Sequence, residues 1–153
     1  MKFLMPDKKS ITDMLSMLLG DDLTVKQAAA PMTDAAYAAI YVDSDAAPGA
    51  VCLCSKTFVV YAGAALSMVP PGGARDALKE AVLPEVIAGN FNEVMNICTR
   101  LVMSEETPHL RLAKVCLVSA ADGLDLVEKA GTRADFELVI PKYGSGFVAF
   151  LVT

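Results

Sequence analysis

The sequence of 153 residues has one histidine and no tryptophan, and it lacks the short motifs that mark many enzyme families. It contains no glycine-rich phosphate-binding loop and no Gly-x-Ser-x-Gly motif around a nucleophilic serine. The single histidine, His109, follows a proline in a Pro-His-Leu segment, where we expect a surface side chain rather than a general base. These absences exclude the common nucleotide-hydrolysing and serine-nucleophile classes.

Positive charge and long apolar runs are also scarce. The 13 lysines and arginines are outnumbered by 18 acidic residues, the net charge is −5, and no basic run is longer than Lys8-Lys9. A chain of this charge repels phosphate backbones, so we expect no nucleic-acid partner. The apolar run at 58–69 stops at Pro70, short of the roughly 20 residues that span a bilayer. Because the N-terminus also has no signal-peptide pattern, we expect a cytoplasmic protein without a membrane span.

The four cysteines do not fit a metal site. Cys52 and Cys54 are separated by one residue, whereas zinc-binding pairs are usually separated by two or more. In the cytoplasm thiols stay reduced, and free cysteines are among the most buried residue types. We therefore expect Cys52, Cys54, Cys98 and Cys116 to be reduced core residues, and we expect no bound metal.

Core-forming residues are abundant: 54% of the chain is hydrophobic. This length and composition predict one folded domain over residues 1–153. Apolar residues three and four positions apart predict helices at about 11–19 and 58–68. Short apolar segments bounded by turn residues predict strands at 24–30, 36–42, 50–54, 112–119, 134–140 and 146–152. The order predicts an α+β fold: an antiparallel sheet covered by helices and built from two helix-plus-three-strand units.

A long helix is predicted between the two sets of strands, from about residue 74 to about residue 104. Pro84 lacks a backbone donor, so this helix must either kink there or begin again with Pro84 in its first turn. On a helical projection one side is apolar, and we expect it to face the core. The opposite side carries Glu85, Gly89, Asn92, Glu93, Asn96 and Arg100.

Glu93 and Asn96 lie one turn apart on this polar side and therefore point the same way. Gly89 is unusual within a helix, where glycine costs about 1 kcal/mol relative to alanine. Close approach by another backbone, or loosening near Pro84, would explain it. From periodicity alone, the ordinary interpretation of such a polar side is a solvated helix face without further function.

The stretch at 92–97, Asn-Glu-Val-Met-Asn-Ile, resembles the core of the CheC/CheX/FliY phosphatase family, whose motif is Asp or Ser, three residues, Glu, two residues and Asn. The expected order of helices and strands is similar to this family over nearly the whole chain. Gly89 stands where the family has Asp or Ser, and the family's downstream proline is missing. Residues 12–16 contain no second Glu-x-x-Asn, so the resemblance implies one site, as in CheX.

The resemblance implies hydrolysis of the aspartyl phosphate on a CheY-type response-regulator receiver domain. The receiver would supply Mg²⁺, and the chain would need no cofactor of its own. We expect Asn96 and Glu93 to be catalytic, Asn96 holding the attacking water and Glu93 pairing with a receiver lysine. Gly89, Asn92 and Arg100 are the expected partner-binding residues. An acyl phosphate is already activated, so a water placed by a neutral amide suffices without a strong base.

Two alternatives stay open. An adaptor would keep the fold and bind a receiver domain or another signalling protein without catalysis, which the altered motif at Gly89 would suit. A small-ligand module of another class would need a lined cavity, with Glu93 and Asn96 buried inside the fold.

Because CheX-type relatives are dimers, the resemblance also implies a homodimer, which we expect to pair through the edge of the last strand, 146–152.

Overall fold

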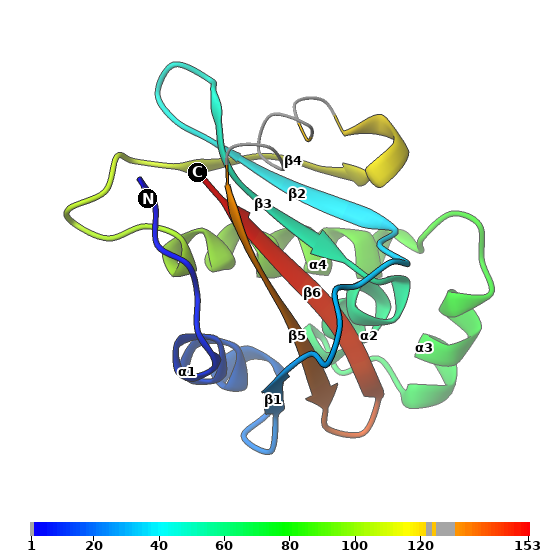
Figure 1. Cartoon of the computed structure of the whole chain (residues 1–153). Coiled ribbons are helices and arrows are strands. Elements are labelled where there is room, and N and C mark those ends of the chain that lie inside the picture. The colour runs from blue at the N-terminus through cyan, green and yellow to red at the C-terminus, as the bar shows by residue number, and fades with distance from the viewer. Residues whose placement is uncertain (1, 122–123, 125–130) are drawn as a thin grey trace.

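The computed structural model describes residues 2–121, 124 and 131–153 (Figure 1). The α-helices of this part are α1 (Lys8–Leu19), α2 (Lys56–Leu66), α3 (Pro71–Leu78) and α4 (Glu85–Ile97). Two short 3-10 helices are η1 (Cys98–Leu101) and η2 (Val118–Ala120). The strands are β1 (Thr24–Gln27), β2 (Tyr37–Val42), β3 (Pro48–Cys54), β4 (Arg111–Leu117), β5 (Thr132–Ile140) and β6 (Gly144–Val152).

These strands form one sheet in the order β1-β5-β6-β3-β2-β4, and every neighbouring pair is antiparallel. β6 and β3 lie at the centre, β5 and β2 flank them, and β1 and β4 form the edges. Each strand of the first half is therefore mirrored across the centre by its counterpart in the second half: β1 by β4, β2 by β5 and β3 by β6. The predicted α+β class and its two helix-plus-three-strand units are confirmed.

The place of the last strand was predicted wrongly. β6 pairs with β3 on one side and with β5 on the other, so both of its edges are filled and neither is available for a dimer contact. β1 ends at Gln27 instead of residue 30, and it lies at a sheet edge, as the nearby Pro31 allows. The other strands differ from the prediction by one or two residues at an end.

The sheet buries both of its faces. One face packs against α1, α2 and α4 and forms the main core, with Tyr41, Phe58, Phe91 and Phe150 among its largest members. The other face carries a smaller apolar cluster, which includes Ile40, Leu53 and Leu151 and packs against Met32, Ala35, Val118 and Leu124. β3 lies at the centre and is buried over nearly its whole length, as expected for a strand covered on both faces.

Helices α2 and α4 lie close together because α2 presents a glycine where they meet. A Cβ on Gly63 would lie 2.6 Å from the carbonyl oxygen of Ile87, so only glycine permits this approach. Phe58 and Phe91 pack edge to face, with ring centroids 5.9 Å apart. The side-chain amide of Asn90 donates to the Gly63 carbonyl at 2.8 Å. These contacts fix how α4 is rotated, and therefore which of its side chains face outward.

The single helix expected from residue 74 to residue 104 is three helices in the structure. α3 begins at Pro71, so the Pro-Pro-Gly-Gly stretch starts a helix instead of ending one; the missing proline N–H is not needed in a first turn. α4 then begins directly after Pro84, so the expected restart is confirmed and the kink is wrong, but Pro84 is the N-cap and does not lie in the first turn. Beyond residue 97 the chain tightens into η1. No helix in the described part combines the length and apolar character needed to cross a bilayer.

All four cysteines are free thiols in the structure. Cys52, Cys54 and Cys98 are buried and Cys116 is half-buried, which confirms the predicted core placement for the first three. Burial raises the pKa of the Cys52 and Cys98 thiols well above the ordinary value. Because the Cys52 and Cys98 thiols are buried and protonated, they serve to pack the core.

Candidate functional site

The outer face of α4 presents the polar side chains that the sequence predicts to face away from the core. The inner face is buried at Ile87, Phe91, Val94 and Met95. Glu93, Asn96 and Arg100 are exposed to solvent. At a spacing of three residues, Glu93 and Asn96 have Cβ atoms about 5–6 Å apart on one side of the helix. One ligand can therefore meet both side chains.

Glu93 and Asn96 contribute to a hollow of about 370 Å³. The hollow forms where the end of α4, the following η1 and the segment that leads into β4 come together. Its lining includes Glu93, Asn96, Arg100, Met103, His109 and Arg111. The site therefore combines one carboxylate, one amide and two guanidinium groups around a shallow depression.

Four polar side chains of this hollow have no partners within the described part of the chain, whereas Thr99, which also contributes to the lining, donates to the Asn96 carbonyl. No hydrogen bond or ion pair joins the side chains of Glu93, Asn96, Arg100 or Arg111 to another described residue. In a chain with a net charge of −5, two unpaired arginines beside an amide form a local positive region that attracts an anionic group. The small-ligand alternative requires Glu93 and Asn96 to be buried inside the fold, whereas both side chains are exposed.

Gly89 and Asn92 are exposed on the same helix but do not line the hollow. A Cβ added to Gly89 would meet no atom within 4 Å. Close approach by another backbone therefore does not explain this glycine, and because Pro84 lies outside α4, loosening at an internal proline does not explain it either. Nothing in the structure requires glycine at this position, and a serine or aspartate side chain would fit.

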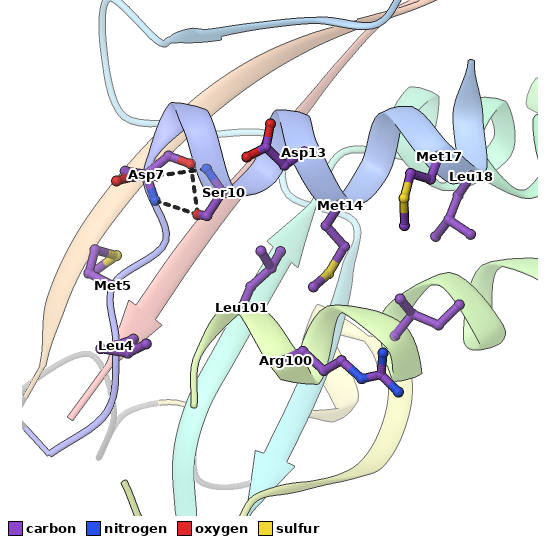
Figure 2. Close-up of a pocket in the computed structure, with 11 residues that line it drawn as sticks. Leu4, Met5, Asp7, Ser10, Asp13, Met14, Met17, Leu18, Arg100 and Leu101 are labelled. Atoms are coloured by element: carbon purple, nitrogen blue, oxygen red, sulfur yellow. Dashed lines mark hydrogen bonds between the residues drawn. The ribbon is translucent and has the colours of Figure 1, made fainter. Parts of the chain in front are cut away.

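A second, mostly apolar groove of about 580 Å³ runs beside the hollow, between α1 and the end of α4 (Figure 2). Leu4, Met14, Met17, Leu18 and Leu101 supply its apolar lining, and Asp13 lies at its edge. The side chain of Met17 is 80% exposed. Ile97 and Arg100 line both the groove and the hollow, so the two depressions form one continuous surface. Methionine side chains adapt readily to different apolar partners.

The sequence did not assign His109 and Arg111 to this site. Both follow α4 by little more than a dozen residues, and the segment between returns along the end of the helix to begin β4 at Arg111. The sequence carries no strong signal for this placement, because an extended connection of this length could reach far beyond the helix end. His109 is exposed, as predicted for a surface side chain.

Comparisons with known proteins identify the fold. No family model matches the sequence, and no curated protein matches it. Among solved structures, a chain of the FliM–SpeE complex from H. pylori has a TM-score of 0.65 and 8% identity, over 95% of this chain and 80% of that chain. FliY from Thermotoga maritima has a TM-score of 0.56 and 12% identity, over 94% and 83% of the two chains.

The FliM middle domain from H. pylori gives a TM-score of 0.52 at 8% identity, over 95% of this chain and 84% of that chain. These three similarities confirm the predicted resemblance at the level of the fold. The chain has the α+β fold of FliM and FliY, over nearly its whole length. At such low identity, the residues of the hollow must be interpreted from their own geometry and chemistry.

Proposed function

We propose that the chain is a CheX-like phosphatase that hydrolyses the aspartyl phosphate of a phosphorylated CheY-type receiver domain. The observation that supports this most strongly is the exposed, unpartnered pair Glu93 and Asn96 beside the two arginines of the hollow. A side chain that is to reach a phosphoaspartate on another protein must project outward from a rigid element. α4 provides that element, because its inner face is packed against the core.

In this reaction a water molecule attacks phosphorus, the bond to the aspartyl oxygen breaks, and inorganic phosphate and a free carboxylate result. Asn96 holds the water in line, since its side chain can both donate and accept a hydrogen bond without adding charge. Glu93 pairs with a lysine of the receiver and thereby orients the two proteins. Mg²⁺ belongs to the receiver and offsets the phosphoryl charge. Arg100 and Arg111 attract the anionic surface around the phosphoaspartate.

The test is single-turnover dephosphorylation of a panel of receivers labelled with phosphate on aspartate. Asn96→Ala removes the group that holds the water, and Glu93→Ala removes the group that orients the receiver. Each substitution should slow phosphate loss about 100-fold if this positioning supplies most of the catalysis. Gln27→Ala and Glu80→Ala are matched controls, because both side chains are exposed and lie outside the hollow and the groove. If every receiver loses phosphate at its spontaneous rate, the phosphatase proposal fails.

The second candidate is an adaptor that binds a receiver domain without hydrolysis. Two observations favour it: Gly89 replaces the acidic or hydroxyl residue of the motif, and the apolar groove lined by Met17 adjoins the hollow through Ile97 and Arg100. Titration calorimetry separates the two functions. Tight binding of a phosphorylated receiver with an unchanged phosphate lifetime supports the adaptor, whereas faster phosphate loss supports the enzyme.

By the same resemblance we infer a homodimer. Since β6 lies inside the sheet, the pairing must use a surface other than the edge of that strand. Sedimentation velocity over a wide concentration range should give a species of twice the chain mass. A single species of about 16.1 kDa at high concentration would contradict this inference.

A further inference from the structure

Two hydroxyl groups anchor the backbone on either side of the Asn96 side chain. The buried hydroxyl of Tyr41 donates to the Met95 carbonyl at 2.7 Å. The hydroxyl of Thr99 donates to the Asn96 carbonyl, also at 2.7 Å. The Met95 carbonyl carbon is bonded to the Asn96 nitrogen, so these two acceptors belong to the peptide groups immediately before and after the Asn96 Cα. Both peptide planes are therefore held.

Asn96 needs such anchors because of its place in the helix. α4 ends at Ile97, one residue beyond Asn96, and the chain continues as the 3-10 helix η1. Helix ends fray, and the change from α to 3-10 geometry weakens the regular hydrogen-bond ladder. A residue at this point would otherwise be less restrained than one in the middle of α4.

Tyr41 connects this point to the sheet. It lies in β2, where it is paired with Ala50 of β3 and Leu112 of β4, and its side chain is fully buried. Burial raises the pKa of Tyr41 well above its ordinary value, which favours the protonated hydroxyl that donates this hydrogen bond. A phenylalanine would fill the same core volume without a hydroxyl that needs a buried partner.

We propose that Tyr41 and Thr99 are positioning residues that fix the Asn96 side chain for its work on the phosphoaspartate. This inference rests on the proposed phosphatase function. Both act through the backbone of Asn96: Tyr41 is fully buried, and Thr99, although it contributes to the lining of the hollow, is itself buried and directs its hydroxyl to the Asn96 carbonyl. Because a misplacement of about 1 Å can cost on the order of 100-fold in rate, a partial loosening should lower kcat while leaving docking through Glu93 intact.

The kinetic test uses Tyr41→Phe and Thr99→Val, each of which removes one hydroxyl at nearly constant volume. Each should lower kcat about tenfold with KM unchanged, and Thr99→Ser should restore the rate because it restores the hydroxyl. Tyr143→Phe is the matched control: it also removes a tyrosine hydroxyl that donates to a backbone carbonyl, that of Val69, away from the hollow. If Tyr41→Phe and Tyr143→Phe have the same kcat, the inference is overturned.

A double-mutant cycle separates positioning from a general loss of stability. In the Asn96→Ala background, Tyr41→Phe should cause no further loss of kcat, because the side chain that it positions is gone. Equal losses in both backgrounds would overturn the inference. Thermal unfolding of each variant identifies those that remain folded at the assay temperature.

Nuclear magnetic resonance tests the same inference without any partner. Tyr41→Phe and Thr99→Val should shift and broaden the Asn96 side-chain amide signal, whereas Tyr143→Phe should leave it unchanged. If the Asn96 signal is unaffected by Tyr41→Phe and Thr99→Val, the positioning role is overturned, whatever the activity. If the signal responds but no receiver is dephosphorylated, the anchoring stands and the proposed function is what fails.

Discussion

Helices α1 and α4 occupy corresponding places in the two halves of the fold, yet their outer faces differ in one respect. Each helix precedes three strands of its half and buries an apolar stripe in the main core. On α1 the polar side chains have partners within the same helix: the carboxylate of Asp7, the N-cap, accepts from the backbone N–H of Ser10 at 2.8 Å, and the Lys9 side chain pairs with Asp13 at 2.6 Å. On α4, Glu93 and Asn96 have no such partners among the described residues.

This difference separates a face that stabilises its own helix from a face that is free to bind. Asp7 caps α1 together with Ser10 in a reciprocal pair of hydrogen bonds. α4 has no side-chain cap, and its Glu93 and Asn96 side chains are exposed to solvent. Unpaired polar side chains on a well-packed helix can exchange water for a partner without first breaking an internal contact.

The largest expected effect comes from changing the charge of the α4 face at constant shape. Asn96→Asp keeps the size of the side chain, but the added negative charge repels the phosphoryl group and the donor is lost. We expect the dephosphorylation rate to fall about 100-fold. Lys9→Gln on α1 lowers the net charge by the same one unit, by removing a positive charge, and should leave the rate unchanged. A variant Asn96→Asp with wild-type kcat would contradict the role assigned to the amide.

A smaller effect should follow from the groove that α1 shares with α4. If the receiver covers this groove, Met17→Lys places a charge against its apolar surface and should raise KM about tenfold with little change in kcat. Met68→Lys is the control, because Met68 is 78% exposed, much like Met17, and does not line the groove. Equal KM values for the two variants would show that α1 takes no part in docking.

Gly89 allows a test of helix stability on α4 itself. Gly89→Ala should raise the free energy of unfolding by about 1 kcal/mol, since the position is helical, exposed and open around a Cβ. Urea denaturation followed by circular dichroism measures this change. A destabilised variant would mean that the glycine serves a contact that the structure does not contain.

The smallest effect concerns pH and the cap of α1. The hydrogen bond from the Ser10 amide, and then that from its side chain, hold the pKa of Asp7 below its ordinary value. A group with a lowered pKa in the folded state stabilises the protein above its unfolded pKa, and this contribution is lost as the pH falls through the folded pKa. The Tm difference between wild type and Asp7→Asn should therefore shrink below about pH 4. A difference that stays constant down to pH 2 would argue against the cap.

Much of the fold was predictable because it depends on local patterns. Apolar spacing and turn residues located each strand, and all but β1 to within two residues at each end. The helical period alone predicted that Glu93, Asn96 and Arg100 face outward, although Arg100 lies in η1, beyond the end of α4. Pro84 marked a break, but sequence could not decide between a kink and a restart, because that choice depends on how α3 and α4 pack against α2.

The sequence by itself determined the class of fold, the outward pair on α4 and the resemblance on which the proposed role of the pair rests. Only the tertiary structure decided that β6 lies inside the sheet, that His109 and Arg111 join the hollow, and that Tyr41 anchors the backbone at Asn96. The physical reason is the range of the interactions. Helical and strand periods act between near neighbours in the chain, whereas strand order and the bond from Tyr41 join residues more than fifty positions apart.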